Sequence, residues 1–330
     1  MKPANSNLAE IKEKLPKATK ESYEQNGWKF EFQKGGIMPS DQLDQLCDYL
    51  VLNAIPDVVY GENYARFTFE QQNFCLEFLP KDSLLLTNFQ ACSNALLDLK
   101  QHPNLKKYKE VNNVTYVPTE VKVKYAEHWK NKKPEDKTAE IKVIQQISDV
   151  FFSTPYKGTV KKVSLLAEPQ KNHTYLKDQL SEKSQFQELQ NIEFPYAERT
   201  NEEIPIHNLT EQNPIKWANM ADLWEDELGD SGSTTSEVRF RVMGDCWFAL
   251  LRHYLRVDDV LIRIFDTRFY HEFGKNYILR EFQVREDSYQ NIAKKGFHFT
   301  PKWMLDQGQS HMVYQYIDPI LIEREKIYFK

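Results

Sequence analysis

The sequence predicts an α+β protein built on a largely antiparallel β-sheet core with flanking helices. Apolar and polar residues alternate within residues 65–78, and again in several runs within residues 237–284, as half-buried strands require. Two other segments carry apolar residues three and four apart behind a capping residue, which predicts helices. The chain has 330 residues, enough for one large core, and we expect a single domain with charged insertions at about 93–119 and 161–203.

The first part of the chain is expected to form an arm followed by a helix. Residues 1–26 are polar and lack sustained periodicity, which predicts a disordered N-terminal arm before a domain over residues 27–330. Ser40 can cap a helix, and Pro56 closes that region. The apolar stripe of this helix consists of Leu43, Leu46, Cys47 and Leu50.

A hairpin is expected next. Residues 65–69 and 74–78 each alternate, and the short polar link between them predicts that the two strands pair. Further along, residues 121–126 predict another strand and residues 155–158 a turn.

The strongest helix pattern covers residues 214–228. Asn213 suits the N-cap, Pro214 the first helical position and Gly229 the position after the last turn. The apolar stripe of this predicted helix consists of Trp217, Met220, Ala221, Trp224 and Leu228. The acidic run at residues 225–227 is either solvated surface or a patch for a basic partner.

The last third of the chain predicts an antiparallel meander. Residues 238–242, 260–264 and 277–284 read as successive strands. Residues 247–257 fit either a helix or a buried strand, and we favour the strand because a hairpin turn signal at residues 258–259 follows it.

Composition narrows the class of function. The formal net charge of −5 gives no global attraction to nucleic acid or anionic lipid. The four cysteines lack C-x-x-C spacing, so no zinc or redox motif is predicted. An aromatic content of 13% indicates either partner binding or a β-rich core. No apolar run is long enough for a membrane span or a signal peptide, so we expect a cytoplasmic protein, present also in the nucleus.

Two enzyme hypotheses remain weak alternatives. Residues 229–232 resemble a serine nucleophile loop around Ser231, but a connector between a helix and a strand explains them better. Asp266, His271 and Glu272 are possible metal ligands, yet alternation places His271 on the strand face opposite to the two carboxylates. A hydrolase is therefore the alternative to a binding protein.

The richest constellation lies at residues 263–271. Alternation puts Arg263, Phe265, Thr267, Phe269 and His271 on one strand face, and Ile264, Asp266, Arg268 and Tyr270 on the other. Asp266 and Arg268 can form an ordinary structural ion pair. They can also, with Arg280 on the next strand, line a polar cleft that grips a peptide and its terminal carboxylate.

At this point the sequence resembles the TIPRL family, the TOR-signalling-pathway regulator-like proteins. The resemblance is carried by residues 223–228, 241–243, 255–258, 260–263, 266–271 and 279–281. Weaker matches at residues 28–29, 37–38, 126–129, 154–159 and 315–317 extend it over residues 27–329. Two local departures are Asp259, where many relatives have glycine, and Val150, where an aromatic residue is expected.

The resemblance implies a monomeric regulator without catalytic activity or cofactor. Such proteins bind catalytic subunits of type 2A protein phosphatases, engage the phosphatase C-terminal tail and act in TOR signalling or phosphatase assembly. A scaffold for a different partner is the other alternative.

The resemblance also implies partner-binding positions at Asp82, Ile264 and Asp266, and with them Ile204. The strand pattern adds Arg263, Arg268, Tyr270 and Arg280 to this predicted binding set.

Overall fold

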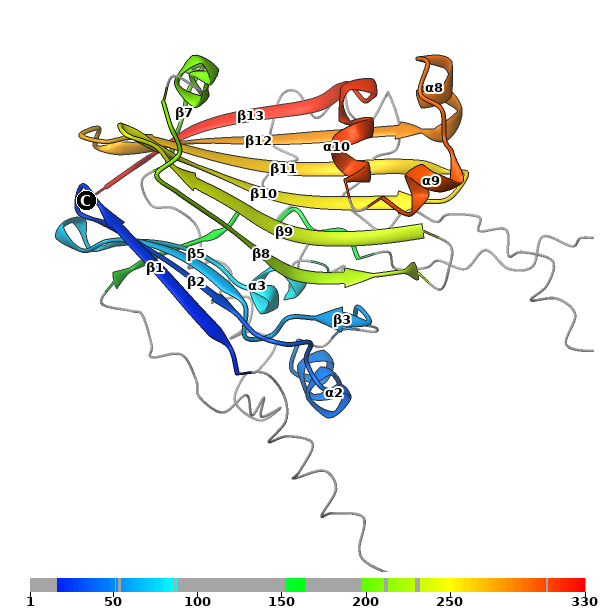
Figure 1. Cartoon of the computed structure of the whole chain (residues 1–330), viewed down its shortest axis with the longest axis horizontal. Helices are drawn as coiled ribbons and strands as arrows, with labels where there is room; N and C mark the ends of the chain where they lie inside the picture. Colours follow the sequence, from blue (N-terminus) through cyan, green and yellow to red (C-terminus); the bar gives the residue numbers. More distant parts are fainter. Residues whose placement is uncertain are drawn as a thin grey trace, which may run out of the picture.

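The computed structural model describes residues 17–50, 52, 55–85, 87, 152–163, 197–210, 213–228, 232–306 and 308–329. These residues form two antiparallel sheets, of five and eight strands, that face each other, with short helices around them (Figure 1). This confirms the predicted α+β class with a largely antiparallel core. The strand predicted at 121–126 and the insertion predicted at 93–119 lie outside the described residues.

The smaller sheet has the strand order β1-β2-β4-β5-β6. Its strands are β1 (Thr19–Gln25), β2 (Trp28–Lys34), β4 (Tyr64–Phe69), β5 (Phe74–Phe78) and β6 (Thr159–Lys162). The predicted hairpin is confirmed as β4 and β5, and a single 3₁₀ turn, η1 (Glu70–Gln72), joins them.

Strand β1 corrects the end of the disordered arm predicted at residues 1–26, of which residues 1–16 lie outside the described residues. It pairs with β2 along its whole length, across a turn in which Asn26 and Gly27 both have positive φ. Most of its side chains are exposed, as expected of an edge strand, so the sequence carries little apolar alternation there. Pairing with β2, rather than its own pattern, holds it in the sheet.

The first predicted helix is confirmed as α2 (Ser40–Tyr49), which buries Leu46. Its cap differs from the prediction. Pro39 occupies the N-cap, Ser40 is the first helical residue, and no side chain caps the helix.

The larger sheet has the order β3-β8-β9-β10-β11-β12-β13-β7. Its strands are β3 (Val58–Val59), β7 (Ala197–Arg199), β8 (Trp217–Asp226), β9 (Gly232–Val242), β10 (Cys246–Val257), β11 (Leu261–Glu272), β12 (Tyr277–Ser288) and β13 (Pro319–Tyr328). The predicted meander and the buried strand at 247–257 are thus confirmed. The first residues of the insertion predicted at 161–203 belong to β6, and residues near its end form β7, which pairs with β13, while residues 164–196 lie outside the described part of the chain.

The helix predicted at 214–228 is wrong, because Trp217–Asp226 form strand β8. The apolar spacing that mimicked a helix results from a β-bulge between Asp222 and Trp224, which changes the register with β9. Met220, which a helix stripe would bury, is 41% exposed. Asn213 does not cap a helix. Its side chain donates to the Asn208 carbonyl and accepts from the Gly244 amide.

The space between the two sheets is filled with aromatic side chains. The rings of Trp28 and Trp247 meet at 5.1 Å between centroids, and those of Phe67 and Phe240 at 4.3 Å. Aromatic pairs of this kind are worth about 0.5–1.5 kcal/mol beyond their buried area. Much of the high aromatic content therefore serves the core.

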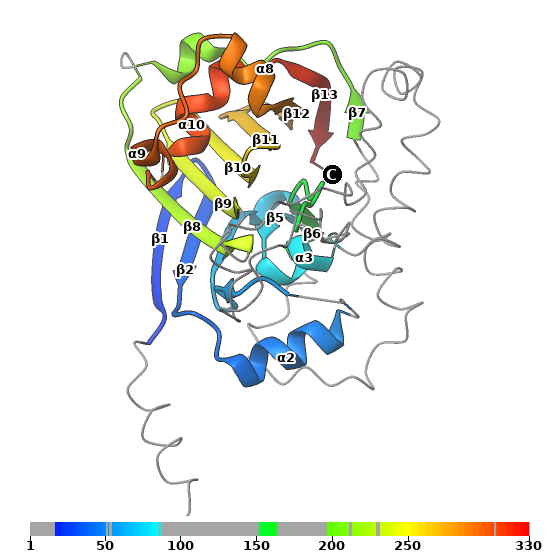
Figure 2. The same ribbon diagram turned by 90° about the vertical axis from the view of Figure 1, so that its right-hand side faces the viewer.

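The outer face of the larger sheet, which points away from the smaller sheet, is capped at one end by α8 (Tyr289–Lys294), α9 (Pro301–Met304), α10 (Gln309–Val313) and η6 (Tyr314–Tyr316) (Figure 2). They bury a second apolar cluster around Ile264, Trp303 and Ile317. In the part of the chain that is described, no helix is long and apolar enough to cross a membrane.

Candidate functional site

Strand β11 has the two faces that its alternation predicts. Arg263 lies on the inner face, toward the smaller sheet, and its Nη1 donates to Ser153 Oγ at 3.3 Å. Arg268 lies on the outer face, where it reaches Glu281 and Tyr314. The outer face of β10–β13, beside the helical cap, holds a continuous polar network.

Asp266 is the centre of this network and is only 1% exposed. Arg252 on β10 binds it with two parallel hydrogen bonds, both 2.7 Å, from Nε and Nη2. Burial alone would lower the pKa of Arg252, but the Asp266 carboxylate outweighs it and raises that pKa. The predicted partner, Arg268, lies further away, with Nη2 3.5 Å from Asp266 Oδ2.

Sequence reasoning missed Arg252 because it occurs within an apolar run. The signal that could have found it is hairpin register. Once Val257 and Leu261 pair across the turn, Arg252 falls directly opposite Asp266.

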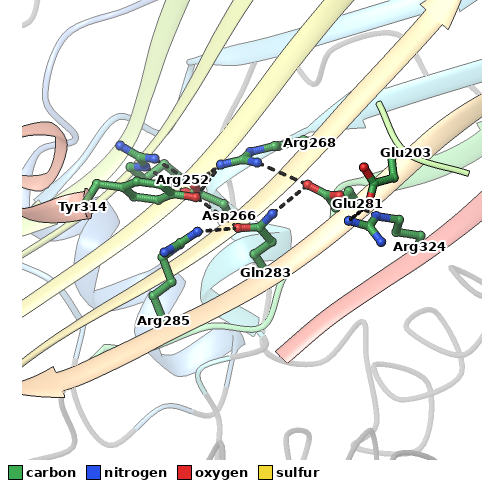
Figure 3. Close-up of polar contacts among 9 residues, drawn as sticks. All are labelled: Glu203, Arg252, Asp266, Arg268, Glu281, Gln283, Arg285, Tyr314 and Arg324. Atoms are coloured by element: carbon green, nitrogen blue, oxygen red, sulfur yellow. Dashed lines mark hydrogen bonds and ion pairs between the residues drawn. The ribbon is translucent and has the colours of Figure 1, made fainter. Parts of the chain in front are cut away.

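The network continues across the sheet from strand to strand (Figure 3). Arg268 Nη1 donates to Glu281 Oε1 at 3.2 Å, and Arg324 Nε donates to Glu281 Oε2 at 2.7 Å. Arg324 also pairs with Glu203 at 3.0 Å. Four strands are thus joined by alternating charges on one face.

Tyr314 attaches the helical cap to this network. Its ring lies 4.9 Å from the Arg252 guanidinium, 5.7 Å from that of Arg268 and 4.1 Å from that of Arg285. Its hydroxyl accepts from Arg268 and donates to Gln283 Oε1 at 3.0 Å. Burial raises the pKa of Tyr314, and the nearby Asp266 charge is the second largest cause of that rise.

Positive charge exceeds negative charge in this network. Four arginines (252, 268, 285 and 324) surround two buried carboxylates, Asp266 and Glu281, and a third carboxylate, Glu203, is largely exposed. The Arg285 guanidinium donates to the Ile317 carbonyl and to Gln283, with no carboxylate at ion-pair distance among the described residues. The surface is therefore suited to an anionic group.

A pocket of about 220 Å³ adjoins the network beyond Glu203. It lies between the segment at residues 202–208 and the ends of β11 and β12. Ile204 and Tyr270, both members of the predicted binding set, pack together beside it with Leu279. The pocket and the network together form the candidate site.

The structure brings some of the predicted binding residues together and separates others. Asp266, Arg268, Tyr270 and Ile204 lie along the outer face. Ile264 lies on the same face but is fully buried under the helical cap.

Three predicted residues lie on the other side of the sheet. The expectation that Arg280 shares the cleft of Asp266 is wrong, because Arg280 lies on the inner face and pairs with Glu325. Arg263 pairs with Glu286 at 2.5 Å on the inner face as well. Asp82, in α3 (Pro80–Leu85), accepts from Thr159 Oγ1 at 2.7 Å.

Residues 154–159, one of the weaker family matches, hold α3 in place. Thr154 Oγ1 donates to the Ser83 carbonyl, and the buried Tyr156 hydroxyl donates to the Glu77 carbonyl. Gly158 has φ +78°, and a Cβ there would lie 2.8 Å from the Phe78 ring. Only glycine fits that position without displacing the core.

The residues of the two enzyme hypotheses do not form a described site. Ser231 lies outside the described residues. Asp266 and His271 point to opposite faces of β11, as predicted, and burial lowers the pKa of His271 to about 4. Among residues that the structure describes, no group of three His, Cys, Asp or Glu side chains is placed to hold a metal ion.

Arginines on this sheet face, beside a pocket, can offer charge-assisted hydrogen bonds to a polar ligand. The chain belongs to the TIP41-like family, whose family model matches residues 58–293. This confirms the TIPRL resemblance.

Three relatives show the extent of this similarity. The chain is 30% identical over 278 residues to the TIP41-like protein of Dictyostelium discoideum, covering 84% of this chain and 82% of that protein. It is 30% identical over 266 residues to the TIP41-like protein of Homo sapiens, covering 80% of this chain and 76% of that protein. It is 27% identical over 282 residues to the type 2A phosphatase activator TIP41 of Saccharomyces cerevisiae, covering 85% of this chain and 67% of that protein.

Proposed function

We propose that this protein is a non-catalytic regulator that binds the catalytic subunit of a type 2A protein phosphatase and changes its activity or assembly in TOR signalling. One observation carries the proposal: the chain belongs to the TIP41-like family, and two of its yeast relatives bear the name type 2A phosphatase activator.

The outer face of β10–β13 is the proposed binding surface. The excess of arginine supports an anionic ligand, and the C-terminal tail of the phosphatase offers a terminal carboxylate. Arg268 is the predicted residue best able to reach it, because its side chain is 24% exposed while that of Asp266 is 1% exposed. Asp266 then contributes to binding indirectly, because its ion pairs hold the Arg252 and Arg268 side chains in place.

The remaining members of the predicted binding set have weaker support as direct contacts. Ile264 and Arg263 are buried, so their substitution would act through the fold. Ile204, 8% exposed, can reach a partner only at the margin of the surface. Asp82, 9% exposed, lies on the other side of the sheet and cannot share this surface.

A matched pair of arginine variants tests the proposal. Arg268→Gln removes a network cation, and Arg239→Gln removes an exposed cation on the same sheet outside the network. We expect Arg268→Gln to weaken binding to a purified type 2A catalytic subunit by about tenfold or more, the value of one charge-assisted hydrogen bond. Arg239→Gln should bind as the unchanged protein does. Equal affinities would remove the outer face from the binding surface.

A further inference from the structure

The pocket beside the network has a partly apolar wall. Tyr270 and Leu279, each 3% exposed, line it together with Pro205. Asn208 Nδ2 donates to the Tyr270 hydroxyl at 2.8 Å, which fastens the 202–208 segment over the sheet. Such a wall suits the aliphatic part of a long side chain.

Three carboxylates line the pocket, and two of them already have partners. Glu202 pairs with Lys326 at 2.6 Å and accepts from the Tyr277 hydroxyl at 2.9 Å. Glu203 pairs with Arg324 at 3.0 Å. These two carboxylates are therefore held in place by internal ion pairs.

Glu272, the third carboxylate, has no hydrogen-bond or ion-pair partner for its side chain among the described residues. It is half-buried at the end of β11. It lines the pocket together with Tyr270 and Tyr277. Lys275, an exposed lysine of the lining, forms no ion pair with Glu272 in the described part of the chain. The hydrogen bond from Lys326, and to a lesser extent the Lys275 charge, lowers the pKa of Glu202.

We propose that this pocket receives one arginine or lysine side chain of the phosphatase catalytic subunit. The aliphatic part of that side chain would lie against Tyr270 and Leu279, and its cation would meet Glu272. This inference rests on the proposed function, and it adds a contact of opposite polarity to the one proposed for Arg268. A basic group beside an anionic group in the partner would fix the orientation of the complex.

A charge-matched pair of variants tests the pocket. Glu272→Gln removes the unpaired charge and keeps the shape, while Glu70→Gln removes an exposed carboxylate on η1, outside the pocket. Affinity for a purified type 2A catalytic subunit, measured with the full chain, should fall about tenfold for Glu272→Gln and stay unchanged for Glu70→Gln. Glu272→Lys should bind more weakly still. Added salt should weaken binding of the unchanged protein more than binding of Glu272→Gln.

The outcomes separate this inference from the proposed function. If the unchanged protein binds no catalytic subunit, the proposed function fails. If it binds and Glu272→Gln matches Glu70→Gln in affinity and salt dependence, the pocket inference is overturned. Thermal unfolding of each variant shows whether an affinity loss reflects unfolding, and Glu272→Gln should melt as the unchanged protein does, because that side chain holds no internal partner.

Discussion

Replacing Asp266 by asparagine should destabilise the fold. The substitution keeps shape and volume but leaves Arg252, 8% exposed, without its counter-charge beneath Tyr314. Removing one partner of a buried ion pair costs about 3–5 kcal/mol. An asparagine oxygen can still accept one hydrogen bond, so we expect a loss near the lower limit, about 3 kcal/mol.

Urea denaturation followed by tryptophan fluorescence measures this loss as a change in the free energy of unfolding. Asp318→Asn is the matched control, since Asp318 also forms an ion pair but is 83% exposed, and its loss should cost under about 1 kcal/mol. In a double-mutant cycle, Asp266→Asn should cost much less when Arg252 is already glutamine. A loss below about 1 kcal/mol for Asp266→Asn, or additive effects in the cycle, would refute the assignment of this pair as the centre of the network.

Three further predictions concern stability. Burial lowers the pKa of His253 to about 3 and that of His271 to about 4, from 6.5. The free energy of unfolding should therefore fall by about 1.4 kcal/mol per pH unit for each histidine as the pH drops from 6.5 toward those values, and equal free energies at about pH 7 and about pH 5 would contradict this. Asp226→Asn should lower the melting temperature, because the Asp226 carboxylate accepts hydrogen bonds from two backbone N–H groups at 2.9 and 2.6 Å. Glu227→Gln, at its exposed neighbour, should leave the melting temperature unchanged, and equal shifts for the two variants would show that the acidic run is plain surface. Gly158→Ala should cost about 1–3 kcal/mol, from positive φ and the contact with a core phenylalanine ring, and an unchanged urea midpoint would mean that the backbone there relaxes freely.

The sequence pattern predicted correctly those strands in which apolar residues alternate with polar ones and the apolar face is the buried one. The faces of β11 and the choice of strand for residues 247–257 followed from period-two alternation and one turn signal. Strand β8 was missed because a bulge gave its apolar residues a helix-like spacing, and a sequence pattern cannot distinguish these two cases without the pairing strand.

The site was harder to predict because it depends on register between strands. Asp266 and Arg268 were found on one face, but the face of Arg280 depends on how β11 and β12 pair across their turn, and a shift of one residue reverses it. Arg252 binds Asp266 from 14 positions away in the chain, and the Tyr314 ring that covers Arg252 comes from a still more distant segment. No local pattern links either residue to Asp266. The resemblance to a family supplied the class of partner, which the physical pattern alone left open.

Titration of the full chain with a purified type 2A catalytic subunit, with and without the last residues of the phosphatase tail, tests the central proposal most directly. We expect binding to the complete subunit and an affinity at least about tenfold weaker once the terminal residues are removed, because the arginine-rich face then loses its carboxylate ligand. Absence of binding to the complete subunit by the folded protein would contradict the proposed function. Equal affinity for the complete and shortened subunits would contradict the role of the outer face in holding the tail.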